Sequence, residues 1–255
     1  MVWRGILRVC QGTVNLLLSA ALLLCGSFGA YALWDNAQVL ASAADVQAEL
    51  LQWKPQKAAE ESPVPDYGEA FVQLRRINPD VCAWLTMDGT GIDHPVVQGP
   101  NNLSYISRDV FGNFSLAGSI FLDSRDDPKF GEGYALLYGH HMADGNMFGD
   151  LDLYKEKIFF SEHKTGQLIL PERVYQLEVA ACLVTGASDA NIFDPERVRD
   201  QPGKLMEFFR ENGQYIRADL LDREGKYLAL STCSTEFTDA RTVVLARMTA
   251  VEQEE

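Results

Sequence analysis

Basic residues are few in this 255-residue chain: 22 Lys and Arg stand against 36 Asp and Glu, which gives a formal net charge of -14. A chain this acidic is a poor partner for the phosphate backbone of nucleic acids, so we expect no nucleic-acid binding. The simplest interpretation of the acidity is a well-solvated surface; attraction of basic partners is the alternative.

Charged residues are absent from one long stretch. None occurs between Arg8 and Asp35, and residues 13–34 are almost wholly apolar. A helix of about 20 such residues spans a bilayer. Because Arg4 and Arg8 precede the stretch, the positive-inside rule predicts a single-pass anchor with a cytoplasmic N-terminus and an extracellular domain. A cleaved signal peptide is the alternative, but its apolar core is usually only about 7 to 15 residues long.

Cysteine is also scarce, and none of the spacings is regular. The five cysteines are Cys10, Cys25, Cys82, Cys182 and Cys233. The three that follow the apolar stretch resemble neither a disulfide framework nor the paired spacing of zinc sites, so at least one thiol should be free. Cys82 and Cys182 lie inside apolar segments and are predicted to be buried in the core.

The chain has no internal repeat and no low-complexity segment. Residues 35–53 have apolar residues at helical spacing and no proline, which predicts a helix after the anchor. Prolines and charges over residues 54–66 then indicate a linker. We therefore predict three parts: a cytoplasmic stub and anchor over 1–34, a helical extension and linker over 35–66, and a compact domain over 67–255.

The compact domain is predicted to be mainly β with peripheral helices. Eight short apolar segments separated by turn residues cover residues 81–87, 91–98, 115–123, 134–140, 166–171, 174–186, 226–233 and 241–248. This number and spacing favour a closed or nearly closed barrel. Helices are expected over residues 68–78, 147–163 and 193–213, the last being a long helix between strands 6 and 7.

Histidine is limited to four positions, and two of these are adjacent. His140 and His141 follow the strand segment that ends at Gly139. Strand ends commonly carry catalytic groups, so one of these histidines could be a base. A metal site with Asp144 is the alternative, but no i, i+4 histidine pair or nearby Cys or His completes a ligand set. We expect neither a metal nor another cofactor.

Cys233 ends one apolar segment, and Arg241 begins the next eight residues later. Cysteine phosphatases pair such residues on a phosphate-cradling loop, but the intervening residues include no glycine to turn N–H groups inward. Taken singly, Cys233 could be a buried strand thiol and Arg241 a surface ion-pair partner of Glu236 or Asp239. Together with the histidines they give a thiol, an imidazole and a guanidinium at three strand ends.

With these residues in place, the chain resembles a class B sortase of Gram-positive bacteria. The matching segments occur in the family's order: NPDVCAWLTMDGTGIDHPVVQGPNN, LAGSIFLD, LLYGHHMADGNMFGDL and LALSTCSTEFTDARTVVLAR. The resemblance implies an eight-stranded sortase-type β-barrel with a long helix between strands 6 and 7. It also implies a membrane-anchored cysteine transpeptidase, classed with the thiol proteases.

The resemblance implies a role for each strand-end residue. Cys233 is the nucleophile that forms a thioester with a C-terminal sorting signal of an exported protein. His140 protonates the leaving amine and deprotonates the acceptor, which is peptidoglycan or a pilin lysine. Arg241 stabilises the oxyanion or binds the substrate backbone. His141 lies at a position that varies in the family, and it is implied to support the catalytic residues without acting on the substrate itself.

Two further residues are implied to line the peptide groove, namely Asn102 and Ser231. A turn-capping role for the asparagine and a strand role for the serine are equally good interpretations. Two other functions stay open: a hydrolytic cysteine peptidase that uses water as the acceptor, and an inactive sortase-like binding module.

Overall fold

The structure is a computed structural model that describes residues 2–56, 67–221, 224–233 and 238–251. By their internal contacts the residues divide into two units, Met1–Ser42 and Ala43–Glu255. Most of the predicted linker, residues 57–66, lies outside the described residues.

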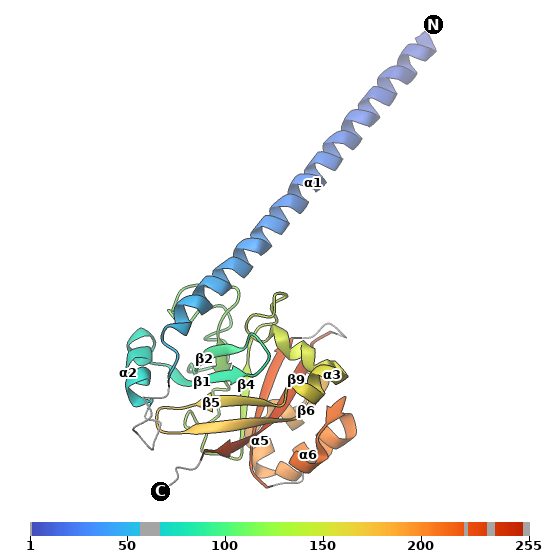
Figure 1. The fold of residues 1–255 in the computed structure, drawn as a ribbon. Helices are drawn as coiled ribbons and strands as arrows, with labels where there is room; N and C mark the ends of the chain where they lie inside the picture. The colour runs from blue at the N-terminus through green and yellow to red at the C-terminus, as the bar shows by residue number, and fades with distance from the viewer. Residues whose placement is uncertain (1, 57–66, 222–223, 234–237, 252–255) are drawn as a thin grey trace. The chain divides into compact units, whose positions relative to one another are not determined.

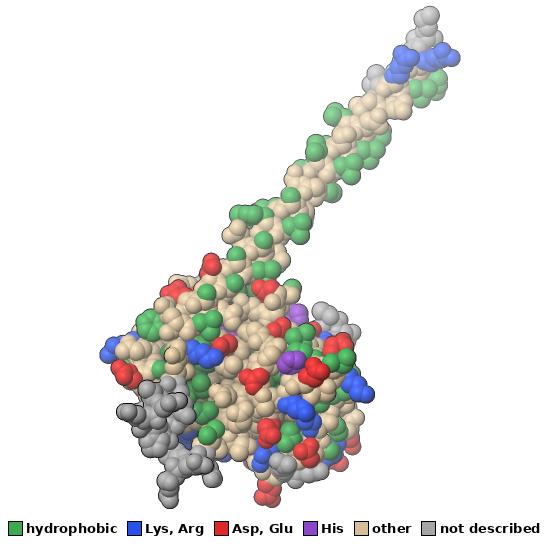
Figure 2. Space-filling model, viewed as in Figure 1, with side chains coloured by type: hydrophobic (Ala, Val, Ile, Leu, Met, Phe, Trp, Pro, Cys, Tyr) green, Lys and Arg blue, Asp and Glu red, His purple; other side chains and the backbone are tan. Residues whose placement is uncertain are grey.

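The first unit consists of helix α1 (Val2–Leu51), which also continues into the second unit. Its apolar side chains, such as Leu16, Leu22 and Phe28, are exposed, and Figure 2 shows hydrophobic side chains along its length and basic ones at its N-terminal end. The helix is long and apolar enough to cross a membrane. The helix predicted over residues 35–53 is therefore the second half of α1.

The second unit contains a closed β-barrel (Figure 1). The strands are β1 (Val81–Met87), β2 (Asp93–Val97), β3 (Ile120–Leu122), β4 (Tyr134–Tyr138), β5 (Thr165–Ile169), β6 (Val174–Gly186), β7 (Tyr215–Ile216), β8 (Lys226–Cys233) and β9 (Ala240–Ala250). Eight of them form a ring in the order β5-β1-β2-β3-β4-β8-β9-β6, and the β5–β6 pairing closes it. The two-residue strand β7 pairs with β6 outside the ring. The predicted eight-stranded barrel is confirmed.

Strand direction decides which residues meet at each end of the barrel. The β2–β3 and β4–β8 pairs are parallel, whereas the other pairs are antiparallel. Strand β8 lies between β4 and β9, and every residue from Tyr227 to Thr232 is buried. A strand buried on both faces needs a continuous apolar run, which is what the sequence LALST approximates. The end of β8 is therefore held by a neighbour on each side.

The segment predicted as one long helix between strands 6 and 7 is helical, but it is divided into α4 (Ala190–Phe193), α5 (Pro195–Asp200) and α6 (Pro202–Asn212). Proline disfavours helical backbone in the residue before it, so Pro195 and Pro202 each start a new helix. Asp194 caps α5 by accepting a hydrogen bond from the Arg197 amide. Helix α6 buries Leu205, Met206 and Phe209.

The remaining helices are α2 (Gly68–Ile77), the 3-10 helix η1 (Gly149–Lys155), α3 (Lys157–Glu162) and α7 (Ala218–Leu221); α2, η1 and α7 contact strands of the barrel, and α3 contacts η1. The helices expected over residues 68–78 and 147–163 are thus present, the second as two short pieces. Cys82 and Cys182 are buried, as predicted, and burial raises the pKa of the Cys82 thiol to about 12. Such a thiol is protonated and inert at neutral pH.

Candidate active site

The topology brings the three predicted catalytic positions to one end of the barrel. Strands β4 and β8 are parallel and pair Tyr138 with Ser231. His140 follows the end of β4, and Cys233 is the end of β8. Strand β9 runs antiparallel to β8, so Arg241 near its start pairs with Cys233. The side chain of Cys233 and residues 234–237 lie outside the described part of the chain.

A pocket of about 210 Å³ opens at this end of the barrel. Its lining residues are Ile106, Phe121, Tyr138, Gly139, His140, Ser231, Thr232 and Arg241. Three apolar or aromatic side chains form one part of the wall, and Phe121 and Tyr138 stack with ring centroids 5.3 Å apart. The pocket therefore combines an apolar surface with two candidate catalytic side chains.

Two residues of this pocket carry buried hydroxyls that lack a hydrogen-bond partner within the described part of the chain. Ser231 Oγ and Thr232 Oγ1 have no hydrogen-bond partner among the described residues. A buried hydroxyl without a partner costs about 1 to 3 kcal/mol. A buried polar group of this kind calls for an explanation, such as a catalytic role or a bound water or ion.

His140 is held by the loop between β2 and β3. Its Nε2 lies 2.7 Å from the Ile106 carbonyl oxygen, to which it must donate because a carbonyl only accepts. In the neutral ring Nδ1 is then the unprotonated nitrogen. Gly118 allows this approach, since its φ is +61° and an added Cβ would lie 2.5 Å from the Ile106 oxygen. The contact thus selects the tautomer of His140.

His141 has a different partner from its neighbour. Its Nε2 donates to Asp152 Oδ2 on η1 over 3.2 Å, so the side chain turns away from the Ile106 loop. Asp152 also accepts from Lys155 and Thr242. Successive residues of an extended segment project to opposite sides, which accounts for the different surroundings of His140 and His141.

Arg241 is half-buried and lines the pocket. Its Nη1 donates to the carbonyl oxygen of Ala240 over 3.0 Å. Among the described residues no carboxylate forms an ion pair with Arg241, Asp239 included, while Glu236 lies outside them. Its other N–H groups have no acceptor within the described part of the chain.

Of the two predicted substrate-binding residues, Ser231 lines the pocket and Asn102 does not. Asn102 donates to Asp123 Oδ2 and accepts from the Ser124 amide, each over 2.8 Å. Asp123 is fully buried and also accepts from Arg125 and from the Tyr138 hydroxyl. Burial alone would raise the pKa of Asp123, but the hydrogen bonds from Arg125 and Asn102 lower it below its usual value.

Sequence reasoning missed the apolar wall and the polar support of this pocket. Ile106, Phe121 and Tyr138 lie far apart in the sequence and read as ordinary core or loop residues. Thr232 directly precedes Cys233 and was not singled out from the sequence. The pairings of β3 with β4 and of β4 with β8 bring Phe121, Tyr138 and Ser231 together, and no sequence pattern gives those pairings.

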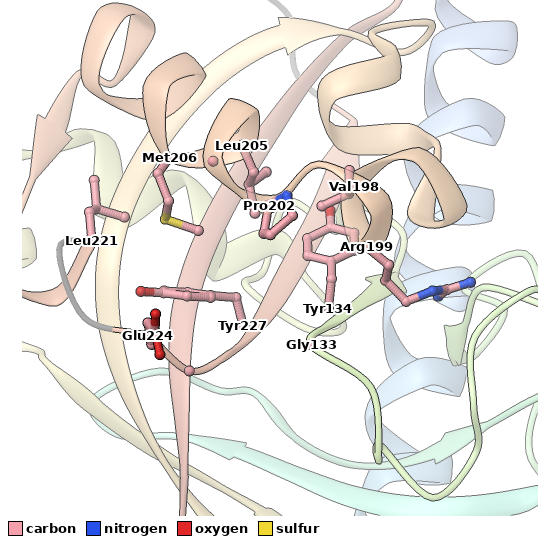
Figure 3. A pocket seen from close by; sticks show the side chains of 12 residues that line it. Gly133, Tyr134, Val198, Arg199, Pro202, Leu205, Met206, Leu221, Glu224 and Tyr227 are labelled. Carbon is pink, nitrogen blue, oxygen red and sulfur yellow. The ribbon is translucent and has the colours of Figure 1, made fainter.

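A larger cavity, of about 480 Å³, lies at the opposite ends of β4 and β8 (Figure 3). Figure 3 shows Tyr134 and Tyr227, from the starts of these strands, facing Pro202, Leu205 and Met206 of α6. Both tyrosine hydroxyls donate to backbone carbonyls, and Arg199 pairs with Asp126 and Glu132. Because those polar groups are satisfied, the smaller pocket is the better candidate for chemistry.

Comparison with known proteins assigns the family. A sortase domain model matches residues 85–249. Sortase B of Staphylococcus aureus is 32% identical over 185 residues, which cover 71% of this chain and 75% of that protein. The crystal structure of a Streptococcus pyogenes class B sortase involved in pilus biogenesis is 39% identical and superposes with a TM-score of 0.65, covering 70% of this chain and 97% of that one.

The Staphylococcus aureus sortase B–substrate complex is 27% identical, with a TM-score of 0.64 over 86% of this chain and 97% of that one. The family model alone covers more than half of the residues, and the matches in sequence and in structure agree on the class. The chain therefore belongs to the sortase family, in class B, and is a cysteine transpeptidase of surface proteins.

Proposed function

We propose that Cys233, His140 and Arg241 perform this transpeptidation through a thioester. The observation that carries the proposal is the pairing of Cys233 with Arg241 across β8 and β9, next to the strand end that leads to His140. A nearby guanidinium favours the thiolate form of the cysteine, which is the nucleophilic form. His140 and Arg241 line one pocket, and the pairing of Cys233 with Arg241 supports a place for the thiol beside it.

In the first half-reaction the Cys233 thiolate adds to the scissile carbonyl carbon of a sorting signal. The tetrahedral intermediate collapses when the C–N bond breaks, and the leaving amine takes a proton from the His140 imidazolium. In the second half-reaction an acceptor amine gives its proton to His140 and attacks the thioester, and the thiolate leaves. The nucleophile and the histidine return to their starting states.

The tautomer of His140 determines which nitrogen carries the transferred proton. Nε2 keeps its hydrogen because it donates to the Ile106 carbonyl oxygen. Nδ1 is therefore the nitrogen that we expect to exchange the proton with the leaving and incoming amines. The loop that contains Ile106 thus takes part in catalysis by orienting the ring.

Arg241 suits the developing negative charge on the carbonyl oxygen. Its guanidinium stays charged at all relevant pH values and offers several N–H donors in a fixed plane. One donor is used by the Ala240 carbonyl, which restrains the side chain at the edge of the pocket. Preorganised donors of this kind stabilise a transition state without paying for reorganisation.

The pocket supplies the means of binding a peptide. The Ser231 hydroxyl, which has no hydrogen-bond partner among the described residues, is suited to a backbone group of the peptide, and the Phe121–Tyr138 wall to an apolar side chain. Asn102 is placed to act indirectly, through Asp123 and Tyr138. The strongly acidic chain is compatible with a basic tail on the substrate.

We further propose that α1 anchors the enzyme in the membrane with its N-terminus in the cytoplasm. The arginines before the apolar stretch support this orientation. The catalytic domain then stands outside the cell, where exported proteins and their amine acceptors are found. Both peptidoglycan and a pilin lysine offer a primary amine, and the mechanism above is the same for each.

The test uses the full chain in detergent with a library of fluorescence-quenched peptides. Cleavage, a mass increase on Cys233 equal to the acyl fragment, and faster turnover when an amine such as triglycine is added are the expected results. Cys233→Ala is the control and should do none of these. Turnover that yields only the free acid with amine present would indicate a hydrolytic peptidase, and peptide binding without acylation would indicate a binding module.

A further inference from the structure

Asp152 on the 3-10 helix η1 makes three polar contacts that neither catalysis nor the pocket uses. Its Oδ1 accepts a hydrogen bond from Thr242 Oγ1 over 2.7 Å. Its Oδ2 lies 3.2 Å from His141 Nε2 and 3.0 Å from Lys155 Nζ. Hydrogen bonds that involve an ionised carboxylate are stronger than those between neutral groups.

The partners of this carboxylate are the chain neighbours of two candidate catalytic residues. His141 directly follows His140, and Thr242 directly follows Arg241. One side chain therefore connects the segment after β4 to strand β9. The two segments are not neighbours in the barrel, because β8 lies between β4 and β9.

Of the contacts that Asp152 makes with His141 and Thr242, we expect the one with Thr242 to matter more, because Thr242 is buried. Thr242 is fully buried and pairs with Thr232 of β8, the residue before Cys233. Loss of the carboxylate would leave the Thr242 hydroxyl without this acceptor, at a cost that favours local rearrangement of β9. Lys155 lies three residues after Asp152 on the same helix, and its ion pair with Asp152 holds the carboxylate in place.

We propose that Asp152 is a positioning residue that holds His140 and Arg241 in their catalytic arrangement. Within the described part of the chain its polar contacts are with His141, Thr242 and Lys155, so it acts on His140 and Arg241 through His141 and Thr242. The inference rests on the proposed function for the roles of His140 and Arg241. A displacement of about 1 Å in a catalytic group can lower a rate a hundredfold, so a small loosening of either segment is enough to matter.

The competing explanation is that Asp152 only stabilises η1. Asp150 provides a matched control, since it lies on the same helix and its Oδ2 accepts from the Gly91 amide over 2.7 Å. Asp150→Ala removes the same charge and a comparable hydrogen bond, but it does not touch the neighbours of His140 or Arg241. A purely structural role predicts similar behaviour for the Asp150 and Asp152 variants.

The kinetic experiment compares Asp152→Ala, Asp150→Ala, Thr242→Val and Thr242→Ser in the full chain, on a peptide that the wild type cleaves. Asp152→Ala and Thr242→Val should lower kcat by about ten- to a hundredfold with KM changed by less than about twofold. The double variant Asp152→Ala/Thr242→Val should be no slower than the slower of its two single variants, because both substitutions break the Asp152–Thr242 hydrogen bond. Thr242→Ser keeps the hydroxyl and should keep kcat near the wild-type value. Asp150→Ala should also keep kcat, while lowering the melting temperature.

A second readout needs no peptide substrate. The pH dependence of Cys233 alkylation by iodoacetamide, followed by mass spectrometry, reports the pKa of the thiol. Asp152→Ala should raise this pKa toward the ordinary value of about 8.5 as Arg241 becomes less well held, and Asp150→Ala should not. If Asp152→Asn, a milder change for folding, and Asp152→Ala both match the wild type in kcat and in alkylation, the proposal is wrong. If Cys233 of the wild type is alkylated at low pH but the wild type cleaves no peptide, the result counts against the proposed function and not against the positioning role of Asp152.

Discussion

Cys233, the last residue of β8, lies directly opposite Arg241, the second residue of β9. Directly opposite residues of an antiparallel pair are the closest cross-strand neighbours and share a face of the sheet. Two residues that are eight positions apart in the sequence are thus brought together by the pairing of β8 with β9. The pairing is fixed by a strand that is buried on both sides.

The first prediction concerns the nucleophile. Cys233→Ala should abolish peptide cleavage and acyl-enzyme formation, because no other thiol among the described residues lines the pocket. Intact-protein mass spectrometry and a cleavage assay measure both. Cys82→Ala is the control: it removes a buried thiol and should lower the free energy of unfolding by roughly 1 to 3 kcal/mol while acylation continues. Turnover by the Cys233 variant would refute the assignment.

The second prediction separates the adjacent histidines. His140→Ala should lower the rate by orders of magnitude, because a general acid and base typically contributes about a hundred- to ten-thousandfold. His141→Ala should cost far less, since His141 bonds to Asp152 and does not line the pocket. Steady-state kinetics on one peptide tests both. Equal losses, or a larger loss for His141, would show that the roles were assigned the wrong way round.

The third prediction concerns the unpaired pocket hydroxyl of Ser231. Ser231→Ala should raise KM for the peptide but should not lower the free energy of unfolding, because the hydroxyl has no hydrogen bond to lose among the described residues. Ser119→Ala is the matched control, since that buried hydroxyl donates to the Arg108 carbonyl over 2.8 Å. It should lower the free energy of unfolding by about 1 kcal/mol. Chemical denaturation and steady-state kinetics of both variants measure these effects. A Ser231→Ala variant with unchanged KM, or with lowered stability, would contradict the prediction.

The sequence predicts this fold well because its signals are local. Each barrel strand is a short apolar run bounded by turn residues, and Cys233 and Arg241 mark facing ends of two of them. The division of the long helix was predictable from Pro195 and Pro202 but was overlooked. The pocket wall could not be predicted, because Phe121 meets Tyr138 only through the pairing of β3 with β4. Pairings of this kind depend on the whole barrel.

The fourth prediction concerns stability in acid. His94 on β2 is 2% exposed, and burial lowers its pKa from 6.5 to about 4, against a smaller opposing effect of Asp93. Between these pH values the unfolded chain binds the proton and the folded chain does not, so stability is lost as the pH falls from 6.5 to 4. At about 1.4 kcal/mol per pH unit the loss is about 3 kcal/mol.

The variant His94→Phe removes this titration and should flatten that part of the stability curve. Asp126 titrates with the opposite sign, because burial raises its pKa to about 7 and stability then falls as the pH rises from 3.8 to 7. Both proteins contain Asp126, so its contribution cancels in the difference between them. Urea denaturation at several pH values measures that difference, and a difference independent of pH would contradict the prediction.

The last prediction tests whether Arg241 acts through directed hydrogen bonds or through charge alone. Arg241→Lys keeps the charge but loses the planar set of donors, one of which bonds to the Ala240 carbonyl oxygen. If Arg241 stabilises the oxyanion, both Arg241→Lys and Arg241→Ala should lower turnover by about a hundred- to a thousandfold, the usual effect of losing one such donor. Cys233 should still be alkylated by iodoacetamide in both variants, which shows that the thiol remains accessible. Near-normal turnover of the lysine variant would mean that Arg241 supplies only a positive potential to the thiolate, and the oxyanion would then need another donor at the edge of this pocket.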